Sequence, residues 1–180
     1  MESKNIIIIL IVIIVILAAA IGFMVLKPMH ANRQKSKSQA RYTLNGNNAA
    51  RIFQVTNSNV TFKNIFFVNA KTTDNDASHG GAIRGPAENC IFINNSASRG
   101  GAISQCSAWN CIFVNNSAFN GGAAYVSHDT NCIFINNSAF NGGAISDGVA
   151  RNCTFNYNHA KNYGGAMYSI YSRKRAFVFL

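Results

Sequence analysis

The segment Asn110-Cys111-Ile112-Phe113-Val114-Asn115-Asn116 is one copy of a motif that recurs through the second half of the chain. Further copies begin at Asn89, Asn131 and Asn152, and the cysteines that follow these asparagines are each 21 residues apart. A glycine pair follows every copy. An earlier unit at 64–69 fits the pattern if a polar insertion around 72–76 is looped out. The fixed period indicates a repeat architecture.

The repeat unit is better suited to strands than to helices. It is shorter than the two-helix repeats, and its Val, Ile, Phe and Asn content is poor in helix formers. Within each copy, Cys and Phe alternate with Ile or Val at period two, and paired Asn and paired Gly then supply turn chemistry. We therefore predict an all-β, right-handed parallel β-helix of four to five coils over residues 51–172.

The imperfect copy at Asn152 predicts which face of the strand points inward. Thr154 and Asn156 replace the aliphatic residues of the other copies, whereas Cys153 and Phe155 are retained. The Cys and Phe side chains should therefore fill the core, and a column of Asn should close the strand through amide hydrogen bonds. The predicted ladders are Cys90, Cys111, Cys132 and Cys153; Phe92, Phe113, Phe134 and Phe155; and Asn95, Asn116, Asn137 and Asn158.

The glycine pairs are predicted to serve the turns. Glycine either permits a positive φ or lets one coil approach the next closely, and the pattern leaves both explanations open. The predicted turn glycines are Gly80, Gly81, Gly100, Gly101, Gly121, Gly122, Gly142, Gly143, Gly164 and Gly165.

The amino-terminal region is distinct from the repeats. Residues 6–26 carry no charged side chain and are numerous enough to cross a bilayer. The alternative is a cleaved signal peptide, since Ala18-Ala19-Ala20 resembles a cleavage site. We predict an anchor or signal segment at 1–26, a basic polar linker at 27–50 and a short tail at 173–180.

The formal net charge of +10 is unevenly distributed. Basic residues cluster between Lys27 and Arg41 and again at Arg173–Arg175, whereas the stretch from Gly80 to Gly165 holds four basic and three acidic residues. The repeat body is therefore nearly neutral, and it has no basic stripe interleaved with aromatic residues. We expect no nucleic-acid partner.

Gly100-Gly101-Ala102-Ile103 followed by Phe113 to Asn116 resembles the repeat of the chlamydial polymorphic outer membrane proteins. The chain is also similar to adhesin-like surface proteins of methanogenic archaea, which pair such repeats with an Ile-rich membrane segment like Asn5 to Leu17. The resemblance implies a β-helix displayed at the cell surface with a role in attachment. From the placement of the acids described below, we expect no enzymatic activity.

The other reactive side chains do not form a recognisable site in the sequence. Stacked cysteines would have parallel Cβ vectors, so buried free thiols are expected rather than disulfides, with Cys106 outside the ladder. No metal site or cofactor is predicted, because His79, His128 and His159 occupy different repeat positions.

Two other functions stay open as alternatives. A polysaccharide lyase or hydrolase of the pectin lyase-like kind would need acids on neighbouring coils, but Glu88, Asp129 and Asp147 share no column. A carbohydrate-binding module could use Trp109 together with the tyrosines at 125, 157, 163, 168 and 171.

The location of the repeat body is predicted from conflicting signals. Glycosylation acceptor tripeptides begin at Asn59, Asn94, Asn115, Asn136 and Asn152. The positive-inside rule instead favours a cytoplasmic body, because more basic residues follow the apolar segment than precede it. On the resemblance, we expect the body outside the cell, with the membrane as partner through residues 6–26, a surface glycan or protein as ligand, and self-association through open coil ends.

Overall fold

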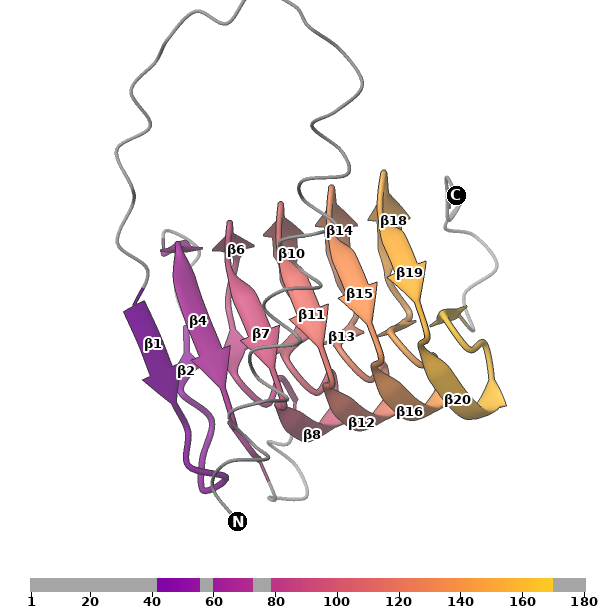
Figure 1. Ribbon diagram of the computed structural model, residues 1–180, viewed down its shortest axis with the longest axis horizontal. Coiled ribbons are helices and arrows are strands. Elements are labelled where there is room, and N and C mark those ends of the chain that lie inside the picture. Colours follow the sequence, from indigo (N-terminus) through magenta and orange to yellow (C-terminus); the bar gives the residue numbers. More distant parts are fainter. Residues whose placement is uncertain (1–41, 56–59, 73–78, 170–180) are drawn as a thin grey trace, which may run out of the picture. The chain divides into compact units, whose positions relative to one another are not determined.

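The computed structural model describes residues 42–55, 60–72 and 79–169, all of which lie in the second of two compact units, 38–180. These residues form an all-β solenoid in which every strand pairs in parallel with the equivalent strand of the next coil (Figure 1). The described residues contain no helix. The predicted parallel β-helix is confirmed at this level.

The first sheet carries the Phe motif and runs the length of the solenoid. Its strands, in spatial order, are β1 (Tyr42–Asn45), β4 (Ile65–Val68), β7 (Ile91–Ile93), β11 (Ile112–Val114), β15 (Ile133–Ile135) and β19 (Thr154–Asn156).

Three further sheets complete each coil. The second consists of β8 (Ser96–Arg99), β12 (Ser117–Asn120), β16 (Ser138–Asn141) and β20 (His159–Tyr163). The third consists of β2 (Phe53–Gln54), β5 (Ile83–Arg84), β9 (Ile103–Ser104), β13 (Ala124–Tyr125), β17 (Ile145–Ser146) and β21 (Met167–Tyr168). The fourth consists of β3 (Phe62–Lys63), β6 (Ala87–Glu88), β10 (Ser107–Trp109), β14 (His128–Thr130) and β18 (Val149–Arg151).

The solenoid has six coils, as the six strands of the first sheet show, so the predicted count of four to five was too low. The additional coil begins with β1, which lies inside the stretch predicted as linker. Leu44 of β1 pairs with Phe67 of β4 and stands at the position of the Phe ladder. This coil has neither the cysteine nor the glycine pair of the later copies, so its sequence carries no repeat signal.

A stack of phenylalanine rings fills the interior behind the first sheet. Phe113 lies 4.7 Å from Phe134 and 4.9 Å from Phe92 between ring centroids, with interplanar angles of 3° and 5°. The stack extends to Phe67 at one end and Phe155 at the other. Because equivalent residues repeat at the strand spacing, each ring packs on the same ring of the next coil.

The two glycines of a pair have different roles: the first adopts a positive φ, and the second lets one coil approach the next closely. Gly121 has a φ of +63°, which L side chains rarely adopt. Gly122 is the point of close approach, since a Cβ on it would lie 2.1 Å from the carbonyl oxygen of Gly143 in the next coil.

Asparagine supplies the two corners that flank the first-sheet strand. Asn110 before the first-sheet strand and Asn115 after it have φ of +52° and +54°, and equivalent asparagines of other coils have the same conformation. Asn tolerates this left-handed region better than other non-glycine residues. The Asn pairs therefore turn the chain where the strand motif starts and ends.

The predicted membrane anchor at 6–26 and the predicted tail at 173–180 lie outside the described residues. Within the part of the chain that the structure describes, no helix has the length and apolar character needed to cross a membrane.

Candidate functional site

The Asn ladder lies inside the coil. Asn95, Asn116 and Asn137 have no solvent exposure. The Asn116 side-chain nitrogen donates to the Phe92 carbonyl and to the Asn137 side-chain oxygen, both at 3.0 Å, and the ladder continues from Asn137 to Asn158. The Asn116 side-chain oxygen also accepts from the backbone N–H of Asn95 at 3.0 Å, so each internal amide satisfies a buried backbone donor at the corner.

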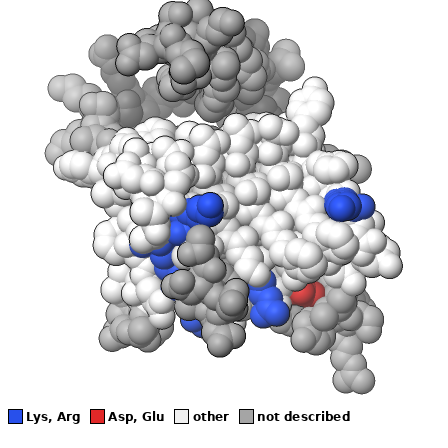
Figure 2. Space-filling view, turned by 90° about the horizontal axis from the view of Figure 1, so that it is seen from below, with Lys and Arg blue, Asp and Glu red and all other residues white. Residues whose placement is uncertain are grey.

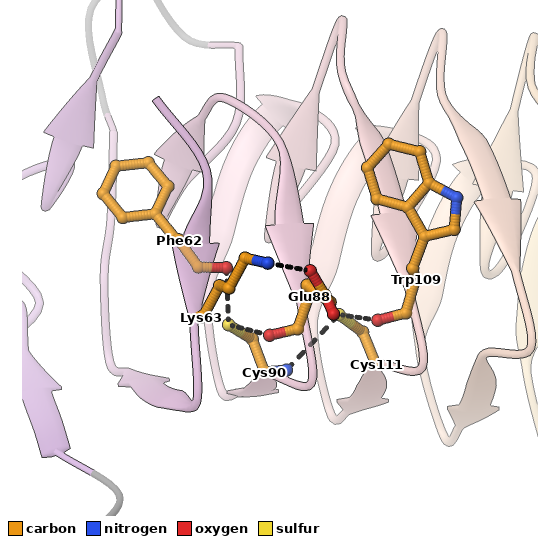
Figure 3. A network of polar contacts seen from close by, with 6 residues as sticks. All are labelled: Phe62, Lys63, Glu88, Cys90, Trp109 and Cys111. Carbon is orange, nitrogen blue, oxygen red and sulfur yellow. Dashed lines mark hydrogen bonds and ion pairs between the residues drawn. The ribbon is translucent and has the colours of Figure 1, made fainter. Parts of the chain in front are cut away.

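The cysteine ladder performs a similar task at the preceding corner. The backbone N–H of Cys90 donates to the sulfur of Cys111 at 3.4 Å, and the Cys111 thiol donates to the Trp109 carbonyl at 3.2 Å (Figure 3). All five cysteines are free. The hydrogen bond with Cys111 and burial raise the pKa of Cys90. These thiols therefore serve as buried polar caps.

Cys106 belongs to a different corner. Burial raises its pKa to about 12. It stands one coil below Ser127, which is fully buried and donates to a carboxylate oxygen of Asp129 at 2.7 Å. Asp129 is itself only 1% exposed, and its other oxygen has no hydrogen-bond partner among the described residues. Burial raises the pKa of Asp129 well above its usual range.

The acids do not converge on one site. Glu88 pairs with Lys63 at 2.6 Å on the outer face of the fourth sheet (Figure 3). Asp129 points inward from the same sheet, and Asp147 accepts a hydrogen bond from Ser146 at 3.2 Å. Among the described residues, no three His, Cys, Asp or Glu side chains are grouped as a metal site.

The predicted glycosylation acceptors, apart from Asn59, fall within the described residues. Asn94, Asn115, Asn136 and Asn152 are exposed at corners. The Asn136 side-chain nitrogen, to which a glycan would be attached, donates to the side-chain oxygen of Asn115 at 2.7 Å. Asn152 donates in the same way to Asn131. These external asparagine ladders were not anticipated from the sequence.

The aromatic residues considered for sugar binding are divided between faces. Trp109 is 41% exposed on the fourth sheet, whereas Tyr163 and Tyr168 stack on each other at 5.4 Å near the last coil. Tyr125 lies on the third sheet, and Tyr171 is outside the described residues. The tyrosines and Trp109 therefore do not make one platform.

The first sheet does not carry a continuous apolar stripe on its outer face. Such a stripe would be expected if the side chains opposite the Cys and Phe face, Ile91, Ile112 and Ile133, were all exposed. Ile133 is 37% exposed, but Ile91 and Val114 are buried. The stripe therefore offers no continuous surface for self-association.

Among the residues that the structure describes, charge is concentrated in a basic cluster at the corner between the second and third sheets. Figure 2 shows Lys and Arg side chains gathered toward one side of the face seen from below. Arg99 ends β8 and contacts the Nε2 atom of His79 at 3.3 Å, and its guanidinium lies 5.5 Å from the ring centroid of Tyr125. His79 and Tyr125 meet edge to face at 5.6 Å.

Successive coils contribute the arginines of this cluster. Arg51 precedes β2 and donates to the Gly80 carbonyl at 3.0 Å, Arg84 ends β5 and donates to Gln105, and Arg99 follows on the next coil. Burial and then the charges of Arg99, Arg84 and Arg51 lower the pKa of His79. Arg99 can therefore donate to an unprotonated His79.

Sequence reasoning did not find this cluster. Its residues occupy different repeat positions, and His79 follows the insertion at 72–76 that breaks the period. A signal was nevertheless present, since Arg51, Arg84 and Arg99 all precede Gly100, whereas the predicted repeat body holds one arginine after it, Arg151. It could be interpreted only once coil positions were known.

Comparison with known families gives one match. The profile of the Chlamydia polymorphic membrane protein repeat matches residues 89–105 and 152–169. These segments contain β7 to β9 and β19 to β21, so each covers a first-sheet strand and the glycine pair that follows it. The match supports the predicted repeat family. The similarity to archaeal adhesin-like proteins stays a prediction.

No curated protein and no solved structure matches the chain.

Proposed function

We propose that this chain is an adhesin-like β-helix protein displayed at the cell surface and attached to the membrane through residues 6–26. The observation that carries the proposal is the match of two coils to a membrane-protein repeat. The interior supports it, because the Phe, Cys and Asn ladders are used to stack coils. Stacking of this kind produces a rigid rod whose outer faces are available for contact.

The proposed role is structural and non-enzymatic. The three described acids point in separate directions, with Glu88 paired to Lys63, Asp129 in the interior and Asp147 at a corner. Paired-carboxylate hydrolysis requires two acids that face one bond. Incubation of the full chain with polygalacturonate and a neutral galactan should release no new reducing ends, and release from either would favour the enzyme alternative.

Binding of a glycan is the second candidate function. It is favoured by the basic cluster, where Arg99 contacts Tyr125 and His79 and the charge of Arg84 also acts on His79. A carbohydrate-binding role is compatible with surface display, since both require an exposed rod.

Protease treatment of intact cells tests the location. The proposal expects peptides from the repeat body to be released while a cytoplasmic marker stays intact. If the body stays uncut while a known surface protein is digested, and is cut after lysis, the surface location is wrong.

A further inference from the structure

We infer that the corner formed by Arg84, Arg99, His79 and Tyr125 binds an anionic polysaccharide, whose carboxylate or sulfate groups are bound by the two guanidinium groups. The inference names a ligand class for the proposed surface role, and its biological use rests on that role. Binding by the purified chain is nevertheless independent of where the chain is located.

The charges of the two arginines are not neutralised by the acids that the structure describes. Arg84 donates to the neutral amide of Gln105, and Arg99 contacts His79, whose lowered pKa favours the uncharged ring. The ion pair between Lys63 and Glu88 lies on the fourth sheet. A guanidinium held by neutral partners keeps its full charge and its preference for oxyanions.

The neighbours also hold the guanidinium groups in place. Tyr125 lies beneath the Arg99 guanidinium at 5.5 Å, and the His79 ring meets Tyr125 edge to face. Ser104, which is fully buried, lies 3.5 Å from the Nδ1 atom of His79. Side chains fixed in this way lose less conformational entropy when an anion binds.

The spacing favours a polymer over a single small anion. Arg84 and Arg99 come from adjacent coils, and Arg51 precedes them on the coil before. Adjacent coils are separated by about 4.8 Å, the strand spacing. The arginines occupy different positions around their coils, so their charges are spread over the corner rather than aligned in one column. A chain of acidic sugars can contact more than one of them, and the combined contacts raise its affinity over that of one sugar.

The same geometry argues against nucleic acid. Binding of single strands depends on aromatic faces on which bases can stack. Tyr125 is the aromatic residue at this corner besides the His79 ring, and its face is covered by Arg99. A glycan needs no base stacking.

The test compares two double variants of the full chain purified in detergent. Arg84→Gln with Arg99→Gln removes the proposed site, whereas Arg151→Gln with Lys161→Gln removes the same charge from exposed positions on the fourth sheet and at the far end of the second sheet. Binding to immobilised polygalacturonate and dextran sulfate is measured beside the neutral polymers galactan and dextran. Thermal unfolding of each variant checks that the stack is intact.

We expect the wild type to bind at least one anionic polymer and neither neutral one. The site variant should bind about tenfold more weakly or worse, because each 1.4 kcal/mol of lost interaction is a factor of ten. The control variant should stay within about twofold of wild type, a difference well below 1 kcal/mol. Arg84→Lys with Arg99→Lys keeps the charge without the planar fork and should retain part of the binding.

Three results would overturn the inference. They are the absence of wild-type binding to both anionic polymers, an equal loss in the site and control variants, and a preference for anionic lipid vesicles over every glycan. None of these results bears on the location of the repeat body, which is tested on intact cells. A failed location test likewise does not affect the binding measured with purified protein, so the two proposals can fail separately.

Discussion

The side-chain nitrogen of Asn116 donates a hydrogen bond to the side-chain oxygen of Asn137 at 3.0 Å, and this contact links two adjacent coils inside the solenoid. Asn116 also accepts from the side chain and the backbone N–H of Asn95. It is therefore the partner of two buried donors below it.

The first prediction concerns this residue. Asn116→Ala should lower the free energy of unfolding by about 1–3 kcal/mol or more, because it removes the oxygen that accepts from the buried backbone N–H and side-chain amide of Asn95. Ser117→Ala, at the next and exposed position, should change it by less than about 0.5 kcal/mol. Urea unfolding of the two variants measures the difference, and equal midpoints would contradict the role of the ladder.

The second prediction uses the glycine pairs of two coils. Gly122→Ala should disrupt the stack, because its Cβ would lie 2.1 Å from the Gly143 carbonyl oxygen. Gly165 is the equivalent residue of the last coil. A Cβ on it would lie 3.4 Å from its nearest heavy atom, the carbonyl oxygen of Asn158, so Gly165→Ala should be tolerated. Melting temperatures separate the two variants, and similar losses in both would show that close approach between coils is not what selects glycine.

Much of the fold could be predicted from the sequence because differences between the repeat copies show which side chains point into the core. The copy with Thr154 and Asn156 identified the outer face, since only that face changes to polar residues while Cys153 and Phe155 are kept. The first coil could not be found, because Leu44 occupies the ladder position without the flanking motif. That coil is recognised only by the pairing of β1 with β4, which the structure shows and the sequence does not.

The candidate site was less predictable. Arg84 and Arg99 look unrelated in the sequence, since one follows a glycine pair and the other precedes one. Both lie near His79, because the chain turns between β8 and the third sheet and because His79 returns beside Arg99 after the insertion. Contacts formed across coils at different repeat positions leave no periodic signal.

The third prediction concerns cysteine reactivity. Cys111 and Cys132 are buried, so a reagent in solution does not reach their sulfur atoms, and burial raises the pKa of Cys106 to about 12, which keeps that thiol protonated at neutral pH. Native protein at pH 7 should take up almost no iodoacetamide at any of the five cysteines within the time that denatured protein is fully labelled. Mass spectrometry of the labelled peptides gives the result, and rapid labelling of Cys111 or Cys132 would mean that the ladder faces solvent.

The fourth prediction concerns pH. The pKa of Asp129 is raised in the folded state, so its protonated form is favoured there, and its contribution to stability is lost as pH rises from the unfolded-state pKa toward the folded-state value. Asp129→Asn should therefore raise the melting temperature more at pH 8 than at pH 4. Glu88→Gln, at a partly exposed position, is the comparison, and a pH-independent effect of Asp129→Asn would contradict the buried neutral carboxyl.

The surface location of the repeat body can be tested most directly with a single cysteine. Ser117 is exposed on β12, whereas the four ladder cysteines are buried, so Ser117→Cys introduces a reactive thiol into a background of low reactivity. Intact cells that express this variant are treated with a membrane-impermeant maleimide, with the unaltered chain as control. The account predicts strong labelling of the variant on intact cells and little labelling of the control. Labelling of the variant only after lysis would place the repeat body inside the cell and contradict the proposed function.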